Sequence, residues 1–337
     1  MGRRVRMITL AALGALVVLA VWTASATAAV FVSKPALSST PRLGVTFTVS
    51  GITTPTVRSG VAPVVMIKVL APNDSGTYVV QRTVKARVVK RAGKPGYRYS
   101  RAITISMVEK VAFRAFRYAG GRVVGKSSRT YAEVTYGRGQ LAHWRFDETT
   151  GTVAADAVGD ADGALEGNPA WTAGAVRGAL SFDGDDGVRV TDVAALMSPA
   201  VTYATWVRPT AFPNAYNEIM AFMRDDRGYR ASVLLMCDGD GHPWVQFQNG
   251  SAVTVDFKSP TSLPTDRWSF LAVSYDGAVV RLFVNGVLKG HVDYAGGIDY
   301  GSGSGQVHFG GDLHYAPGGN AFTGLIDEPA VLDRALK

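Results

Sequence analysis

Two closely spaced hairpin signals in the C-terminal third constrain the fold more than any other feature of the chain. Asp276-Gly277 and Asn285-Gly286 each separate apolar runs. These residue pairs are preferred in two-residue type I′ turns, which need positive φ at both central positions. The runs Trp268–Tyr275, Val279–Val284 and Val287–Val292 are therefore expected to form three consecutive antiparallel strands. Such a meander needs a second sheet to cover its apolar face, and the rest of the C-terminal two-thirds should supply that sheet.

The start of the chain has the composition of a secretory signal peptide. Three arginines among the first six residues precede the apolar run Leu10–Trp22, and A-S-A-T-A follows at 24–28. Because the run is shorter than the ~20 residues of a membrane span, cleavage is favoured over a retained anchor. We therefore assign residues 1–28 to the signal peptide. The mature protein is expected to be secreted or cell-wall associated, with no stable membrane span.

Charge divides the remaining chain into two unlike parts. Residues 31–138 contain 19 Lys and Arg but 3 Asp and Glu, whereas residues 139–337 contain 13 Lys and Arg against 24 Asp and Glu. Repeated positive charge attracts polyanions in a salt-dependent way. In an exported protein the expected polyanions are acidic cell-wall polymers or polysaccharides, and no nucleic acid partner is expected. The alternative is that the basic part docks onto its acidic neighbour or is merely balanced by it.

Residues 29–137 are expected to form an all-β sandwich. Short runs of alternating apolar residues are separated by turn sequences such as P-N-D-S-G at 72–76 and G-K-P-G at 93–96. About seven strands in about 100 residues is typical of an immunoglobulin-like sandwich. The sequence F-R-A-F-R-Y-A-G-G-R-V-V-G-K-S-S-R at 113–129 resembles the last two strands of bacterial Ig-like or fibronectin III-like modules.

Residues 138–337 are expected to form a second, larger all-β domain after a short hinge at Gly137-Arg138-Gly139. Strand candidates recur throughout this part, and no segment has a credible helical pattern. About a dozen strands of this kind predict one two-sheet sandwich of the jelly-roll type.

An ordered series of motifs in this second part resembles the laminin G-like (LamG) family of concanavalin A-like jelly-roll domains. The motifs are H-W-R-F-D-E at 143–148, D-G-A-L at 162–165, G-A-L-S-F-D-G-D-D at 178–186, T-W-V-R-P at 205–209, W-S-F-L-A-V-S-Y-D-G at 268–277, L-F-V-N-G at 282–286, F-T-G-L-I-D-E at 322–328 and D-R-A-L at 333–336. The sequence departs from the family at Pro329, where a β-branched residue is usual. Since proline cannot donate to a strand ladder, the last strand is expected to lie at a sheet edge or to be broken there.

Catalysis is not predicted. Glycosidases of the same overall fold carry alternating carboxylates on one strand, in the form E-x-D-x-E, and this spacing does not occur here. Asp147-Glu148 and Asp327-Glu328 are adjacent pairs, so on a strand their side chains would point to opposite faces. The five histidines are scattered and have no metal-binding spacing.

The LamG resemblance implies a structural Ca²⁺ where the first and last strands meet. Hard oxygen ligands from flexible acidic loops suit this ion. On that resemblance the expected ligands are Asp162, Asp183 and Asp327. The alternative is that these residues only form solvated turns, because Asp favours turns.

Aromatic residues outside the family strand motifs are available for a carbohydrate ligand. Sugars stack their apolar faces on aromatic rings, while polar side chains bind the hydroxyl groups. These freer aromatic residues are Trp171, Trp244, Tyr216, Tyr300 and Tyr315. The predicted ligand patch consists of Trp244, His242 and Asp240 together with His314 and Tyr315. Ordinary loop packing is the alternative interpretation of the same residues.

The sequence therefore predicts a secreted, non-catalytic protein whose LamG-like domain binds carbohydrate or a glycosylated surface. Two alternatives remain open. One is a structural adhesin whose LamG-like domain binds protein, and the other is an accessory module of a glycoside hydrolase system.

Overall fold

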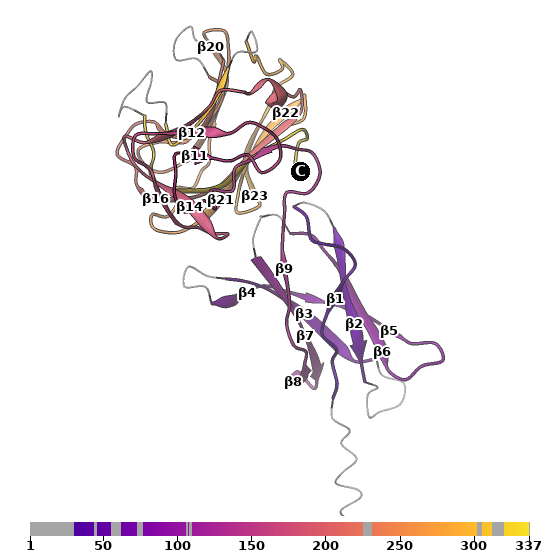
Figure 1. The fold of residues 1–337 in the computed structure, drawn as a ribbon. Coiled ribbons are helices and arrows are strands. Elements are labelled where there is room, and N and C mark those ends of the chain that lie inside the picture. Colours follow the sequence, from indigo (N-terminus) through magenta and orange to yellow (C-terminus); the bar gives the residue numbers. More distant parts are fainter. Residues whose placement is uncertain are drawn as a thin grey trace, which may run out of the picture.

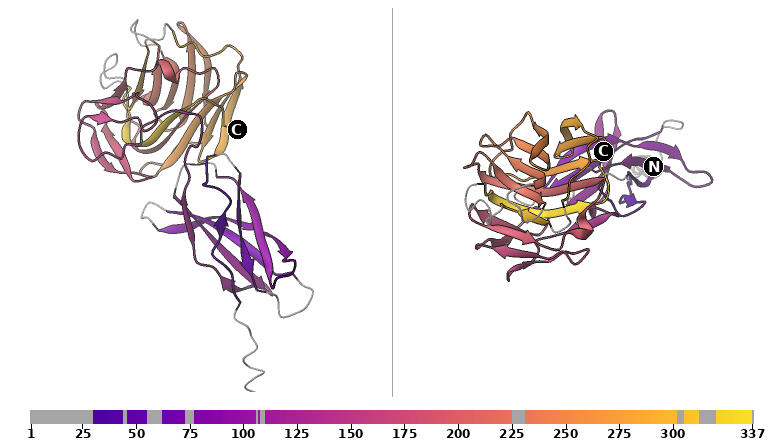
Figure 2. Two further views of the ribbon diagram at one scale, coloured as in Figure 1. Left: turned by 45° about the vertical axis from the view of Figure 1, so that its right-hand side comes forward. Right: turned by 90° about the horizontal axis from the view of Figure 1, so that it is seen from above.

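A computed structural model describes residues 30–43, 46–54, 62–72, 77–105, 107, 110–224, 231–301, 305–311 and 320–336. The predicted signal peptide, His314 and Tyr315 lie outside these residues. The described chain forms two β-sandwiches joined end to end (Figures 1 and 2), so the all-β prediction is confirmed. No helix in this part of the chain is long and apolar enough to cross a membrane.

The first sandwich contains the strands β1 to β9. One of its sheets has the order β1 (Ala36–Leu37), β2 (Phe47–Thr53), β6 (Tyr97–Ile103) and β5 (Arg87–Lys90). The other has the order β4 (Tyr78–Lys85), β3 (Val64–Pro72), β7 (Lys110–Ala119) and β8 (Arg122–Lys126), and β9 (Thr130–Glu133) pairs with β7. Alternate apolar residues of the two sheets, including Val49, Ile67 and Phe113, form a buried core. The assignment of this two-sheet sandwich to the Ig-like class stays a prediction.

The second sandwich contains the strands β10 to β25 in two eight-stranded sheets. The sheet that faces the first sandwich, here the proximal sheet, has the order β13 (Ala170–Ala173), β14 (Gly178–Asp183), β25 (Thr323–Leu332), β16 (Val201–Ala211), β21 (Ser269–Tyr275), β22 (Val279–Val284) and β23 (Val287–Asp293), and β10 (Gln140–His143) also pairs with β25. The other, here the distal sheet, has the order β11 (Val153–Ala154), β12 (Gly163–Glu166), β15 (Gly187–Val190), β24 (Gln306–Phe309), β17 (Asn217–Met223), β18 (Ala231–Cys237), β19 (Pro243–Asn249) and β20 (Ala252–Lys258). Among the described residues of this sandwich there is one 3₁₀ turn, Ala194–Leu196, which lies between β15 and β16.

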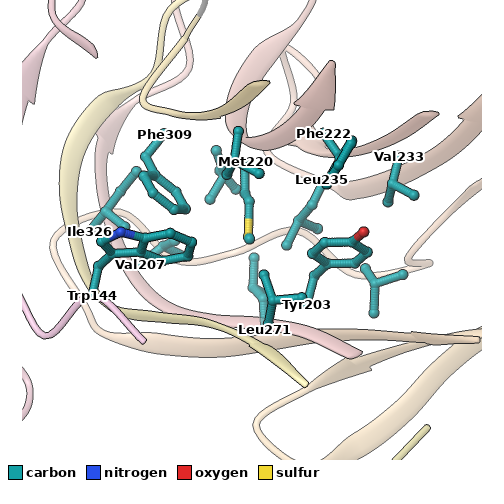
Figure 3. Packing of buried hydrophobic residues seen from close by; sticks show 14 of the residues in the cluster. Trp144, Tyr203, Val207, Met220, Phe222, Val233, Leu235, Leu271, Phe309 and Ile326 are labelled. Carbon is teal, nitrogen blue, oxygen red and sulfur yellow. The ribbon is translucent and has the colours of Figure 1, made fainter. Parts of the chain in front are cut away.

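The inner faces of these two sheets pack against each other. Figure 3 shows Trp144, Tyr203 and Leu271 facing Phe309, Met220 and Phe222. All six side chains are at most 2% exposed. The alternating pattern of the sequence therefore provides the apolar layer that holds the sandwich together.

The predicted three-strand meander is confirmed, but only one of its turns has the predicted geometry. Asn285 and Gly286 have φ angles of 51° and 72°, as a type I′ turn requires. The other connection is a three-residue loop, 276–278, in which Gly277 has positive φ (89°) and Asp276 does not. The Asp276 carboxylate instead accepts hydrogen bonds from the backbone N–H groups of Ala278 and Val279 (3.1 and 2.9 Å), which replaces the tight turn by a capped loop.

Of the two expected arrangements for the last strand, an edge position or a break at Pro329, the edge position is not observed, because β25 lies between β14 and β16. Pro329 is accommodated where β25 changes partners, since β14 pairs up to Ile326 and β10 pairs from Ala330 onward. On the β16 side the register shifts at the same point, and Glu328 has a φ of 52°. A β-bulge therefore occupies the position where proline could not have donated to a regular ladder.

The predicted hinge is held by contacts on both sides. A buried cluster links Leu43 and Tyr136 of the first sandwich to the outer face of the proximal sheet, where Trp206, Phe270 and Leu332 contribute. Arg334 also donates hydrogen bonds to the carbonyl groups of Tyr136 and Arg138, at 3.0 and 3.2 Å. The glycines at 137 and 139 supply positive φ angles for the turn, and the contacts around them fix the joint.

Candidate functional site

The candidate ligand site lies on the outer face of the distal sheet, around β19. Val245 and Phe247 of this strand point into the core, so the alternate residue Trp244 points outward. There it packs against Leu234 and Met236 of β18. In Figure 1, β20 lies far from the first sandwich, whereas β14, β21 and β23 lie on the side that faces it.

Trp244 is the centre of this site. Tyr216, from the loop before β17, stacks on the indole with a centroid distance of 5.2 Å and an interplanar angle of 24°. Lys258 is the cross-strand neighbour of Trp244 on β20, and its Nζ lies 4.0 Å from the centroid of a Trp244 ring. The indole N–H donates to Asp256 at 2.5 Å. Trp244 is thus fixed by partners from both neighbouring sides of β19.

Asp238 fixes the polar half of the site. Its carboxylate accepts hydrogen bonds from the backbone N–H groups of Asp240 (3.1 Å) and His242 (2.8 Å) and lies 2.9 Å from Lys258 Nζ. The His242 ring nitrogen Nδ1 is 3.3 Å from the same carboxylate. Burial acts to raise the pKa of Asp238, but the hydrogen bonds from Lys258 and the backbone outweigh it and lower the pKa. Asp238 is therefore a charged anchor for the Lys258 ammonium group.

These groups surround an open hollow of about 520 Å³. Its lining consists of Ala215, Tyr216, Asp238, Gly239, Asp240, Trp244 and Lys258. Two of the predicted ligand residues, Trp244 and Asp240, line the hollow. His242 does not line it but contacts Asp238, which does. The hollow offers an aromatic surface beside carboxylate and ammonium groups, which is the mixed lining that suits a polar ligand with an apolar face.

The prediction of a ligand patch missed Asp238 and Lys258. Asp238 opens the D-G-D-G sequence at 238–241, which also contains the predicted Asp240. Lys258 could have been found by continuing the hairpin register from Trp244 across to β20, because directly paired residues share a face.

The three predicted metal ligands are not brought together. Asp183 is opposite Thr323 on β25, and Asp327 lies four residues further along that strand, roughly 13 Å away at the usual rise per residue. Asp162 precedes β12 in the distal sheet, where its carboxylate accepts a hydrogen bond of 2.8 Å from Asp156 N–H. The strand pairing therefore does not place Asp162, Asp183 and Asp327 in one shared site.

Asp183 is instead grouped with Asp185 and Asp186. One carboxylate oxygen from each lies within 4.8 Å of the others. Asp186 is buried, which raises its pKa, and it accepts hydrogen bonds from the N–H groups of Asn168 (2.7 Å) and Asp183 (3.0 Å). Asp183 and Asp185 are exposed at the surface of the same turn. Hard carboxylate oxygens of this kind are the ligands that Ca²⁺ prefers.

Asp327 is fully buried in β25. Its Oδ2 accepts a hydrogen bond of 2.9 Å from Val176 N–H, and its Oδ1 has no hydrogen-bond partner among the described residues. Burial raises the pKa of Asp327 to about 8, and the nearby charges of Glu328 and Asp147 contribute to the increase. A buried carboxylate oxygen without a partner is costly unless a proton or a cation satisfies it.

Comparison with known protein families matches residues 182–337 to the family described as the concanavalin A-like lectin/glucanases superfamily. This confirms the resemblance that the motifs of the second sandwich indicated. None of the curated proteins matches the chain.

Three of the solved structures that match part of this chain have low sequence identity to it. Domain 4 of the extracellular arabinanase AbnA from Geobacillus stearothermophilus, in complex with arabinotriose, is 22% identical and has a TM-score of 0.48, covering 59% of this chain and 94% of that one. The CBM40 of the Ruminococcus gnavus IT-sialidase, bound to α2,3 sialyllactose, is 17% identical with a TM-score of 0.41, covering 47% and 91%. The receptor-binding domain of botulinum neurotoxin mosaic serotype C/D is 16% identical with a TM-score of 0.43, and the match covers 59% of this chain and 48% of that one.

Proposed function

We propose that the protein is an exported, non-catalytic carbohydrate-binding protein, and the match of residues 182–337 to the concanavalin A-like lectin/glucanases superfamily supports this proposal. The ligand would occupy the hollow around Trp244 on the distal sheet. The observation that supports this proposal is the stacked pair of Tyr216 and Trp244 beside a fixed set of charged groups.

Each part of the hollow has a separate role in binding a sugar. Tyr216 is 44% exposed, so its outer ring face is open for stacking, while Trp244 supports the ring from beneath. Asp240 and Lys258 are exposed at the rim, where they can bind hydroxyl groups. Since Asp238 and Trp244 already hold Lys258, little side-chain entropy remains to be lost on binding.

The position of the hollow agrees with a binding role at a distance from the first sandwich. The proximal sheet is occupied by the joint, whereas the distal sheet faces away from it (Figure 1). The first sandwich would then act as a spacer that presents the site to a glycosylated surface.

A glycan array with the chain from residue 30 onward tests the proposal. We expect binding of at least one glycan and a loss of about tenfold in affinity, equivalent to about 1.4 kcal/mol, in Tyr216→Ala. Phe31→Ala is the matched control, because Phe31 is a similarly exposed aromatic residue (54%) far along the chain from the hollow. Wild-type protein that binds no glycan but retains binding to a protein surface would contradict the proposal and favour the adhesin alternative.

We also propose that the second sandwich binds Ca²⁺, with a narrower ligand set than the sequence suggested. Asp327 fits a cation because its buried Oδ1 is unsatisfied within the described residues and because nearby Asp147 and Glu328 add negative charge. Asp183, with Asp185 and Asp186, would be a separate surface group. A calcium ion at Asp327 would supply the missing positive charge beside the last strand, and Asp162 has no part in either group.

A further inference from the structure

The outer face of one sheet in the first sandwich concentrates positive charge. Across β4, β3, β7 and β8, the register pairs Lys85 with Met66, Met66 with Phe116, and Phe116 with Lys126. The next row pairs Lys68 with Arg114. Directly paired residues share a face of the sheet, so Lys68, Lys85, Arg114 and Lys126 lie together around Phe116. We call these five residues the basic face.

The centre of the basic face brings like charges together. Lys68 and Arg114 are direct cross-strand partners, and such a pair of like charges destabilises a sheet. Both lie over the ring of Phe116, with Lys68 Nζ 4.6 Å and Arg114 Cζ 5.6 Å from its centroid. The cation–π contacts and a hydrogen bond of 2.8 Å from Arg114 Nε to the Ser127 carbonyl hold the two cations in place. These contacts leave both positive charges without a neutralising carboxylate among the described residues.

No ion pair within the described part of the chain neutralises Lys68, Lys85, Arg114 or Lys126. The apolar cluster around Tyr136, which forms the core of the joint with the acidic second sandwich, contains none of these cations. In the ion pair across the joint, the first sandwich supplies the acidic residue and the second the basic one, because Glu133 of the first sandwich binds Arg177 of the second at 3.2 Å. Among the described residues, no ion pair therefore joins the basic face to its acidic neighbour.

The other sheet of the first sandwich provides a contrast. There the cation Arg98 is opposite Val89 and Ile52, and Arg87 is opposite Ser100. Its basic residues are thus paired with neutral neighbours. On the basic face Lys68 and Arg114 are directly opposed. A bound anion would therefore relieve more charge repulsion on this face than on the other sheet.

We propose that the basic face binds an acidic polysaccharide with repeated carboxylate groups. The face belongs to a sheet and supplies cations on four adjacent strands, which suits an extended polymer with regularly spaced charges. Tyr131 is paired with Ala112 on the same face and is 58% exposed, so it adds a ring for stacking against a sugar. This proposal does not depend on the carbohydrate site of the second sandwich, because the two surfaces share no residue.

The test measures binding of the chain from residue 30 onward to polygalacturonate, with neutral dextran as the uncharged comparison. Wild-type protein should bind polygalacturonate at 50 mM salt and lose affinity steeply toward 200 mM, because exposed charges are screened. The triple variant Lys68→Gln, Arg114→Gln, Lys126→Gln should bind at least tenfold more weakly and with a shallower salt dependence. The triple variant Arg87→Gln, Lys90→Gln, Arg98→Gln removes the same charge from the other sheet and should change affinity less than twofold.

A milder double variant, Lys85→Gln with Lys126→Gln, alters exposed side chains only and should reduce affinity about threefold even if the triple variant is poorly folded. Equal losses in the two triple variants would show that net charge alone matters and would overturn the proposal. It would also be overturned by absence of binding at 50 mM salt, or by single-stranded DNA binding as tightly as polygalacturonate.

Discussion

The hydroxyl group of Tyr136 donates a hydrogen bond of 2.7 Å to the backbone carbonyl of Glu328, and this contact joins the end of the first sandwich to the last strand of the second. The Tyr136 ring is fully buried and meets His143 edge-on, with centroids 5.0 Å apart. His143 in turn lies 2.6 Å from the Glu328 carboxylate. The Glu328 bulge is therefore contacted by both sandwiches.

Tyr136→Phe should destabilise the protein by about 1–3 kcal/mol, because the buried Glu328 carbonyl loses its hydrogen-bond donor while the packing is kept. Urea unfolding measures the change. Tyr131→Phe is the control, since that side chain is 58% exposed, and it should leave the midpoint unchanged. Equal midpoints for Tyr136→Phe and wild type would show that water replaces the lost donor.

Residues 140–337 produced alone should melt at a lower temperature than the same sandwich in the longer chain and should aggregate more readily. The cause is exposure of apolar side chains from the joint, including Trp206 and Phe270, which are 8% and 1% exposed in the whole protein. Calorimetry and light scattering make the comparison. A soluble fragment with an unchanged melting temperature would mean that the joint adds nothing to the stability of the second sandwich.

Calcium should raise the melting temperature of the protein relative to EDTA. Binding to the folded state alone contributes RT ln(1 + [L]/Kd), about 2.7 kcal/mol at one hundred times Kd. For a sandwich of about 200 residues this is a shift of several degrees. Asp327→Asn should remove the difference between calcium and EDTA, and Asp192→Asn should keep it. Identical curves for wild type in the two conditions would eliminate the metal, and loss in Asp183→Asn alone would assign it to the surface group.

Asp276→Asn should reduce the acid sensitivity of the protein. The hydrogen bond from Arg281 (2.8 Å), helped by the N–H groups of Val279 and Ala278, lowers the pKa of Asp276 to about 2. A carboxyl group with a lowered folded-state pKa stabilises the fold above its unfolded pKa of about 4, and this contribution is lost as the pH falls toward 2. The variant should therefore be less stable at pH 7 but lose less stability between pH 4 and pH 2. Parallel stability curves for the two proteins across that interval would contradict this assignment.

The sequence predicted the strands of the meander because Val280, Leu282 and Val284 alternate with residues that remain partly exposed. It predicted the environment of Pro329 less well. The chemistry of proline excludes a regular ladder, but only the three-dimensional pairing of β25 shows that a bulge and a change of partner can place it inside a sheet.

The site was partly predictable for the same reason. Trp244 and Asp240 stand out in the sequence, and both line the hollow. Tyr216 could be identified only as a free loop aromatic, because its stacking on Trp244 depends on how the loop before β17 crosses the sheet. The acidic residues show that composition alone does not predict which carboxylates lie close together. Asp183 and Asp327 are both near glycines in family motifs, yet the register of β14 on β25 separates them.

The packed joint has a further consequence for the two proposed binding surfaces. A flexible linker would let the basic face and the Trp244 hollow search a range of separations, with an effective concentration that falls gradually with linker length. Here Tyr136 and the apolar cluster fix the separation and the relative direction of the two surfaces. A polymer or cell surface would bind with avidity if its acidic and neutral sugars match that spacing, and no linker entropy would be lost. A ligand with a different spacing would bind one surface at a time and would show no avidity. The rigid joint would thus make binding selective for ligands whose acidic and neutral sugars have the matching spacing.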